Sequence, residues 1–167
     1  VFAGIDVIVY CDDNYPPYSY KGGNEVKGIY TEILRTAFSR MEGYKVKIKA
    51  IPWKRGLMYL KDGTGFALYP PYYRLKARPY IWPYSIPVLD ERVVAFCRED
   101  IFEESLRSNW PEDYYGLIIG NNAGFELGGD KFWKAVKEGK IKLDEARGNK
   151  VNILKLGLRR TDCYIND

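Results

Sequence analysis

The first part of the chain alternates short apolar runs with a stretch of helical periodicity. The apolar run 7–11 ends at two aspartates and a proline pair, which is typical of a buried strand that leads into a loop over residues 12–23. Apolar residues then recur every three or four positions over 28–41, which predicts an amphipathic helix. Its expected buried face consists of Ile29, Ile33, Leu34, Ala37, Phe38 and Met41.

The pattern then changes to period two. Residues 44–50 alternate apolar side chains with lysines, as in a strand with one solvated face, and residues 53–60 return to helical spacing before a compact apolar run at 65–69. Strands that alternate with helices indicate a largely parallel sheet, and such sheets bind ligands beyond the carboxyl ends of their strands. This rule favours two aromatic-rich loops, residues 12–18 and 69–78.

The second half predicts a further α/β unit. An apolar strand is expected at 92–97, and the polar stretch that follows favours a boundary. The later elements are expected to be a strand at 115–119, a helix that Asp130 begins, a strand at 141–143, a helix at 150–158 and a strand at 163–165. The predicted organisation is a first lobe at 1–98, a hinge and linker at 99–113, and a partial second lobe at 114–167.

Composition favours binding over catalysis. Apolar residues make up 46% and charged residues 29% of the 167 residues, which indicates a globular chain, while 16% are aromatic and none is His. Without His, a His-based triad and an ordinary His-containing zinc site are excluded, so we expect no enzyme, metal or cofactor. No apolar run has the length of a membrane span and no export signal precedes the first strand, so we expect any signal to have been removed.

The net charge of +4 raises the question of nucleic acid binding. Aromatic and basic residues interleave over 69–84, a pattern that stacks single strands in some proteins. The remaining Lys and Arg residues are spread along the chain and form no stripe. We therefore expect no nucleic acid partner.

The three cysteines, Cys11, Cys97 and Cys163, lie far apart and form no C-x-x-C pair. All three fall in apolar, strand-like segments. The favoured interpretation is three small buried thiols, and the alternative is one disulfide with one thiol left over.

Several segments stand in an informative order. They are DDNYPPYSYKGGNEVKGIYTEIL, IPWKRGLMYLKDG, RPYIWPYSIPVLDERVVAF, GLIIGNNAG and NILKLGLRRTDCYIND. Their order and spacing resemble bacterial solute-binding protein family 3, the periplasmic receptors for amino acids and similar small solutes. The resemblance implies a two-lobed periplasmic binding protein-like II fold, in which each lobe is an open, mainly parallel sheet flanked by helices. It also implies that the second lobe and the segment that returns from it are incomplete here, which would leave an uncovered sheet edge and favour pairing as a dimer.

The resemblance also implies a ligand site. Arg78 would hold the carboxylate of an amino acid and Asp167 its ammonium group, with Arg74 or Lys76 as alternatives that share the role of Arg78. The chain departs from the family at Gly65, where an Asp is usual, and at the Tyr- and Pro-rich loop that replaces a Ser-rich one. The implied ligand-binding residues are Tyr15, Tyr18, Trp53, Tyr69, Tyr72, Arg78, Gly124, Phe125 and Asp167.

By the same resemblance, the expected function is extracytoplasmic capture of a zwitterionic or anionic solute. The lobes would close about a hinge near residues 97–100 and present the solute to an ABC-type permease. The alternative partner is a membrane sensor that uses the domain as its input. A dehydratase on the same fold is the enzymatic alternative, and it would need a carboxylate such as Glu32 or Glu126 inside the cleft.

Overall fold

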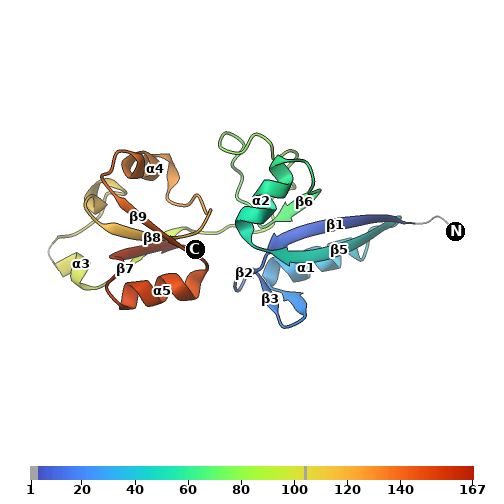
Figure 1. Ribbon diagram of the computed structural model, residues 1–167, viewed down its shortest axis with the longest axis horizontal. Coiled ribbons are helices and arrows are strands. Elements are labelled where there is room, and N and C mark those ends of the chain that lie inside the picture. Colours follow the sequence, from blue (N-terminus) through green and yellow to red (C-terminus); the bar gives the residue numbers. More distant parts are fainter. Residues whose placement is uncertain (1–3, 104) are drawn as a thin grey trace. The chain divides into compact units, whose positions relative to one another are not determined.

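A computed structural model describes residues 4–103 and 105–167, and the chain forms two compact units, Val1–Val88 and Leu89–Asp167 (Figure 1). Residues 1–3, at the start of the expected first lobe, and residue 104, inside the expected linker, lie outside the described residues. No helix of the described part has the length and hydropathy that a membrane crossing requires. The α/β class predicted from the sequence is confirmed.

Unit 1 contains a three-stranded parallel sheet in the order β5-β1-β6 and a small antiparallel sheet in the order β2-β3-β4. Its elements are β1 (Ile5–Asp12), β2 (Asn14–Tyr15), β3 (Ser19–Gly22), β4 (Glu25–Lys27), α1 (Ile29–Phe38), β5 (Tyr44–Ile51), α2 (Trp53–Lys61) and β6 (Ala67–Tyr69). The small sheet occupies most of the segment expected to be a loop at 12–23. The sequence did not predict it, because its short strands show no regular alternation.

The two helices of unit 1 cover opposite faces of β1. Val9 and Cys11 point toward α1 and form a buried cluster with Tyr30 and Tyr69. Tyr10 points to the other face, because side chains alternate along a strand, and its ring centroid lies 5.3 Å from that of Tyr59 on α2. Sequential βαβ connections therefore enclose the sheet from both sides, as the periodicity predicted.

The buried face of α1 differs from the one expected. Tyr30 and Thr31 are buried, whereas Ile29 and Ile33 are exposed. The helix is therefore rotated by about one position from the orientation that apolar spacing alone favoured. The rotation lets the Thr31 hydroxyl hydrogen bond the hydroxyl of Tyr69, with 3.0 Å between the two oxygens. Leu34 and Phe38 of the expected face still pack against the buried cluster, so the prediction was right in part.

Unit 2 contains one four-stranded sheet in the order β7-β10-β8-β9, in which only β7 is antiparallel to its neighbour. Its elements are β7 (Val94–Cys97), α3 (Asp100–Glu103), the 3-10 helix η1 (Glu112–Tyr114), β8 (Ile118–Asn122), α4 (Gly129–Lys137), β9 (Lys142–Ala146), α5 (Asn149–Gly157) and β10 (Cys163–Asn166). Helices α4 and α5 lie on opposite faces of this sheet (Figure 1).

The first strand of unit 2 is β7, which falls within the first lobe expected at residues 1–98. It pairs with β10, so the division between the compact units falls at Val88, before this strand. Short helices α3 and η1 lie within the expected linker 99–113. Pairing with a strand almost 70 positions later is a long-range event that local composition does not reveal.

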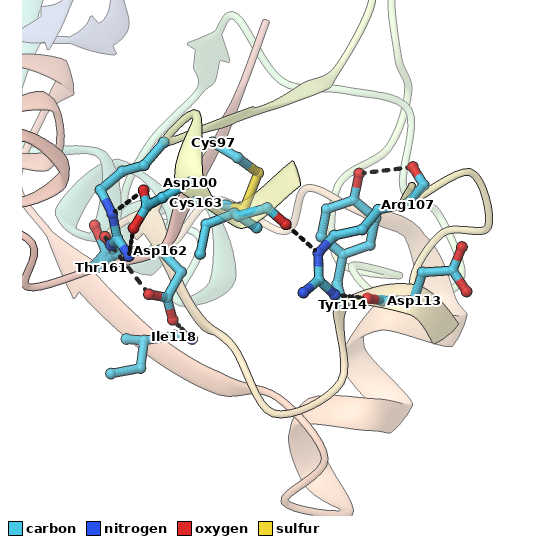
Figure 2. Close-up of a disulfide and its surroundings, with 11 residues drawn as sticks. Cys97, Asp100, Arg107, Asp113, Tyr114, Ile118, Thr161, Asp162 and Cys163 are labelled. Atoms are coloured by element: carbon cyan, nitrogen blue, oxygen red, sulfur yellow. Dashed lines mark hydrogen bonds and ion pairs between the residues drawn. A yellow bond between two sulfur atoms is a disulfide. The ribbon is translucent and has the colours of Figure 1, made fainter. Parts of the chain in front are cut away.

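A disulfide fixes this strand. Cys97 and Cys163 face each other in the antiparallel ladder and are bonded across it (Figure 2). The favoured sequence interpretation of three free thiols was wrong for this pair, while Cys11 is free and buried. The alternative of one disulfide with one thiol left over is the arrangement found.

Arg98 follows Cys97 directly and forms ion pairs with Asp100 and Asp162, which lie near the disulfide in Figure 2. Its guanidinium lies 3.0 Å from Asp100 Oδ1 and 3.1 Å from Asp162 Oδ1, and it donates to the carbonyl oxygen of Thr161 at 2.6 Å. The other carboxylate oxygen of Asp162 accepts the backbone N–H of Ile118 at 2.7 Å. The start of β8 and the turn before β10 are thereby tied to the end of β7.

Candidate functional site

The three parallel strands of unit 1 end at one edge of their sheet. Because β1, β5 and β6 run in the same direction, their last residues, Asp12, Ile51 and Tyr69, lie along this edge. The loops expected to bind ligand, residues 12–18 and 69–78, both begin here. The sequence rule about carboxyl ends therefore brings six of the nine predicted site residues to this part of unit 1.

Arg78 and Trp53 meet at this edge. Trp53 is the first residue of α2, directly after the end of β5, and the guanidinium carbon of Arg78 lies 5.9 Å from the centre of its ring. Arg78 is 5% exposed and Trp53 is 7% exposed, an unusual degree of burial for a guanidinium. Stacking on the π face of an indole is a favourable setting for a cation that is removed from water.

The alternatives to Arg78 are less buried. Lys76 is exposed and Arg74 is half-buried. The backbone of Arg74 serves the loop itself, because its carbonyl oxygen accepts the N–H of Arg78 at 2.8 Å. Tyr72 is half-buried within the same loop. Burial therefore favours Arg78 as the principal cation of this edge.

Tyr15 and Tyr18 form an aromatic pair on the other loop. Their ring centroids are 4.8 Å apart, and Tyr18 continues the contact to Tyr30 of α1 at 5.9 Å. Tyr15 is buried and Tyr18 is half-buried. This chain of rings fixes the loop after β1 and offers a rigid aromatic surface at a small entropic cost.

Tyr69 lies deeper than the other predicted residues. It belongs to the buried cluster with Cys11, and burial raises the pKa of the Tyr69 hydroxyl, which already bonds Thr31. Burial likewise raises the pKa of the Cys11 thiol to about 11. Both groups are therefore neutral at pH 7, and the structure assigns Tyr69 a packing role in the core.

Gly124 and Phe125 lie in the turn that follows β8 in unit 2. Gly124 adopts a positive φ of 85°, which favours glycine, and its N–H donates to the Glu145 carboxylate oxygen Oε1 at 2.8 Å. Phe125 closes the turn, since its N–H donates to the carbonyl oxygen of Asn122 at 2.9 Å. The Asn121 side chain holds it further by donating to the carbonyl oxygen of Phe125 at 2.6 Å.

A network of hydrogen-bonded asparagine side chains lies next to this turn. The Asn122 amide nitrogen donates to Asn149 Oδ1 at 2.8 Å, and the Asn152 amide nitrogen donates to Asn122 Oδ1 at 2.9 Å. The hydroxyl of Tyr164 lies 3.0 Å from Asn149 Oδ1 and 3.2 Å from Asn122 Oδ1. The network joins β8, α5 and β10 at the carboxyl ends of the parallel strands.

Gly120 makes room for this network. A Cβ atom at this position would lie 3.3 Å from Asn152 Oδ1, a closer approach than most side chains tolerate. The absence of a side chain therefore lets α5 bring its polar residues against β8.

Asp167 follows β10 directly and is half-buried. Burial is the main reason that the pKa of Tyr164 is raised, and the negative charge of Asp167 adds to it. The charge of Asp167 therefore acts on the Tyr164 hydroxyl of the amide network. Asp167 lies at the same end of the sheet as the turn of Gly124 and Phe125. The structure places all three predicted residues of the second lobe at this end.

The carboxylates suggested for an enzyme differ in setting. Glu32 pairs with Arg35 and is exposed on the solvated face of α1. Glu126 is half-buried in the turn after β8. Within residues 4–103 and 105–167, no group of three or more acidic or Cys side chains is arranged to hold a metal ion.

Sequence reasoning missed Glu145 and the amide network of Asn122, Asn149 and Asn152. Glu145 lies beside Asn121 in the β8–β9 register, and this pairing brings its carboxylate to the turn. The consecutive residues Asn121 and Asn122 at a strand end were the available signal, because buried amides need partners.

No protein-family model and no curated protein matches the chain. Solved structures do match its fold, and the chain shares the fold of two-lobed periplasmic binding proteins. An arginine transport system periplasmic binding protein from Legionella pneumophila is 14% identical with a TM-score of 0.73, and the match covers 98% of this chain and 69% of that one.

Two further structures are similar. The structure described for glutathione import by GshT and the cystine ABC importer TcyBC of Streptococcus mutans is 19% identical, has a TM-score of 0.77, and is matched over 98% of this chain and 67% of that chain. An ancestral amino acid-binding protein, a precursor of cyclohexadienyl dehydratase, is 20% identical with a TM-score of 0.72, over 97% of this chain and 70% of that one.

Proposed function

We propose that the protein binds a small zwitterionic solute, an amino acid or a related compound, outside the cytoplasm and delivers it to an ABC-type permease. The observation that carries this proposal is the buried Arg78 stacked on Trp53 at the carboxyl edge of the unit 1 sheet. A guanidinium in that position is suited to hold a carboxylate through two parallel hydrogen bonds.

The remaining predicted residues supply complementary chemistry. Asp167 would accept the ammonium group, while Tyr15, Tyr18 and Trp53 would contact the solute side chain. The similar structures include a periplasmic binding protein of an arginine transport system, an ancestral amino acid-binding protein and a structure described for glutathione import, and they support a solute of this class.

The disulfide supports an extracytoplasmic location. Disulfides such as Cys97–Cys163 persist in oxidising compartments and are rare where thiols are kept reduced. An extracytoplasmic location also fits a protein that captures a solute and delivers it to a permease in the membrane.

Calorimetric titration with each of the twenty standard amino acids and glutathione tests the proposal. One class of solute should bind the wild-type protein, and Arg78→Met should weaken that binding by roughly 10- to 100-fold, since a hydrogen-bonded charge is lost. Methionine keeps apolar contact with Trp53, and the exposed Arg55→Met is the matched control that should bind normally. Binding that is unchanged in Arg78→Met would overturn the proposed clamp.

A further inference from the structure

Helix α5 has its polar and apolar sides reversed relative to α4, the helix on the other face of the same sheet (Figure 1). On α4, Phe132 and Ala135 are buried and the lysines are exposed. On α5, Asn152 is fully buried, whereas large aliphatic side chains are exposed to solvent. The exposed aliphatic residues of α5 and of its C-cap are Val151, Ile153, Leu154 and Leu158, with exposed fractions of 45%, 58%, 54% and 66%.

Three of these residues form a stripe along the outer face of α5. Val151, Leu154 and Leu158 are three and four positions apart, so they lie on one side of the helix, away from Asn152. The helix contacts β8, β9 and β10 with its other side, through the hydrogen bonds of the amide network. One exposed Leu is ordinary, but a continuous aliphatic stripe is a surface whose burial is favourable.

The charged residues of this helix and its flanks all have the same sign. Lys155 is engaged within unit 2, where it pairs with Asp144 at 2.7 Å. Lys150, the second residue of α5, and Arg160, shortly after its end, are exposed and form no ion pair with any residue that the structure describes. Segment 146–161 contains no Asp or Glu, and its basic residues are Arg147, Lys150, Lys155, Arg159 and Arg160.

We propose that the outer face of α5 is a docking surface for an anionic phospholipid membrane. An amphipathic helix lies in the plane of such a surface, with its aliphatic side chains among the acyl chains and its cations near the phosphates. The stripe and the unpaired Lys150 and Arg160 supply both contributions from one helix. The surface lies entirely within unit 2 and involves no solute.

The charges favour a membrane over a second copy of this chain. If two α5 helices packed against each other in antiparallel orientation, Lys150 of each would approach Arg160 of the other. In parallel orientation, each cation would approach its own counterpart. Like charges are therefore brought together in both arrangements, which is unfavourable. An anionic bilayer instead neutralises both cations while it covers the stripe.

Sedimentation with lipid vesicles tests the cationic part of this surface. The protein should bind vesicles of phosphatidylcholine and phosphatidylglycerol, and it should bind pure phosphatidylcholine vesicles at least about tenfold more weakly. The double variant Lys150→Gln and Arg160→Gln should bind the anionic vesicles roughly 30-fold more weakly, the effect expected of two cations near such a surface. The matched control, Lys131→Gln with Lys134→Gln, removes the same charge from α4 and should bind within about twofold of wild type.

A second pair of variants tests the aliphatic stripe at constant charge. Leu154→Gln with Leu158→Gln should weaken binding to the anionic vesicles by roughly tenfold or more, because less apolar area is then buried. Met41→Gln with Met58→Gln changes two exposed apolar residues of unit 1 and should leave binding unchanged. All four positions are exposed, so these variants should unfold at the wild-type temperature.

Three results would overturn the proposal. The first is no binding to anionic vesicles, and the second is equal binding by wild type and both α5 variants. The third is an equal loss in the α4 control, which would assign binding to net charge alone. Analytical ultracentrifugation without vesicles should show no dimer that depends on α5. A dimer that Leu154→Gln with Leu158→Gln abolishes would assign the stripe to a second copy and would contradict a membrane partner.

Discussion

The two units present different chemistry at the same place in related sheets. At the carboxyl ends of its strands, unit 1 carries aromatic rings and the buried guanidinium of Arg78, whereas unit 2 carries amides and the carboxylates of Glu145 and Asp167. Rings tolerate a range of contacts, but amides require defined partners. The difference is that unit 1 presents aromatic rings and a buried guanidinium at this edge, whereas unit 2 presents side chains whose positions are fixed by hydrogen bonds.

The helices show the same contrast. Helix α1 packs Tyr30 and other rings against its sheet, whereas α5 turns Asn149 and Asn152 inward and leaves Ile153 and Leu154 exposed. The apolar residues of α5 are therefore a poor guide to which of its faces is buried. The hydrogen bonds of the amide network decide which side of α5 faces the sheet.

The largest expected effect comes from removing the disulfide, which lies in unit 2. The double variant Cys97→Ser and Cys163→Ser should lower the free energy of unfolding of unit 2 by about 2 to 5 kcal/mol, because the disulfide closes a long loop, with a sequence separation of 66. Urea unfolding followed by the indole resonances of Trp110 and Trp133 measures this change. Trp53 and Trp82 report unit 1, and an equal loss there would contradict the assignment.

The amide network of unit 2 comes next. Asn152→Leu keeps the side-chain size and should cost about 1 to 3 kcal/mol of unfolding free energy, because Asn122 Oδ1 loses one of its two donors in a buried site. The reverse change on the outer face, Leu154→Asn, should stay within about 0.5 kcal/mol of wild type. Thermal unfolding of both variants compares the faces, and a larger loss for Leu154→Asn would show that α5 is packed the other way.

A smaller effect is expected from the polar pair in the unit 1 core. Tyr69→Phe should lower the free energy of unfolding by about 1 kcal/mol, since the Thr31 hydroxyl loses its buried partner. The exposed Tyr73→Phe is the control and should have no measurable effect in the same denaturation experiment. Additive losses for Tyr69→Phe and Thr31→Val in the double variant would deny the coupling between the two hydroxyls.

A further prediction concerns the pH dependence that Cys11 introduces. The pKa of its thiol is raised from 9.0 to about 11 in the folded protein by burial, so folding favours the neutral form. The resulting stability is present below pH 9 and is lost as the pH rises from about 9 toward 11. Cys11→Ala should flatten this part of the curve of unfolding free energy against pH. A curve that keeps the same slope in the variant would assign the decline to other groups.

Sequence patterns predicted the order of strands and helices because that order follows from local periodicity. They also located the loops that carry Trp53 and Arg78, since loops at the carboxyl ends of parallel strands follow from the order of elements. Short strands β2 to β4 were missed because two- to four-residue strands carry no measurable alternation.

Features that depend on strand register could not be predicted from the sequence. The Cys97–Cys163 bond requires knowledge that β7 and β10 pair, and the Glu145 contact requires the alignment of Asn121 with Glu145. The predicted buried face of α1 was wrong at Ile29 and Ile33, because apolar spacing does not reveal that Thr31 has a buried partner in Tyr69. In each case, partners distant in sequence determine the outcome.

The most direct test of the account is an NMR titration of the protein with a pool of the twenty standard amino acids, resolved afterwards into single compounds. We predict that one compound shifts the Trp53 indole resonance of the wild-type protein and that Arg78→Met abolishes this shift. No shift of the Trp53 resonance by any compound, or an equal shift in Arg78→Met, would contradict a solute held by Arg78.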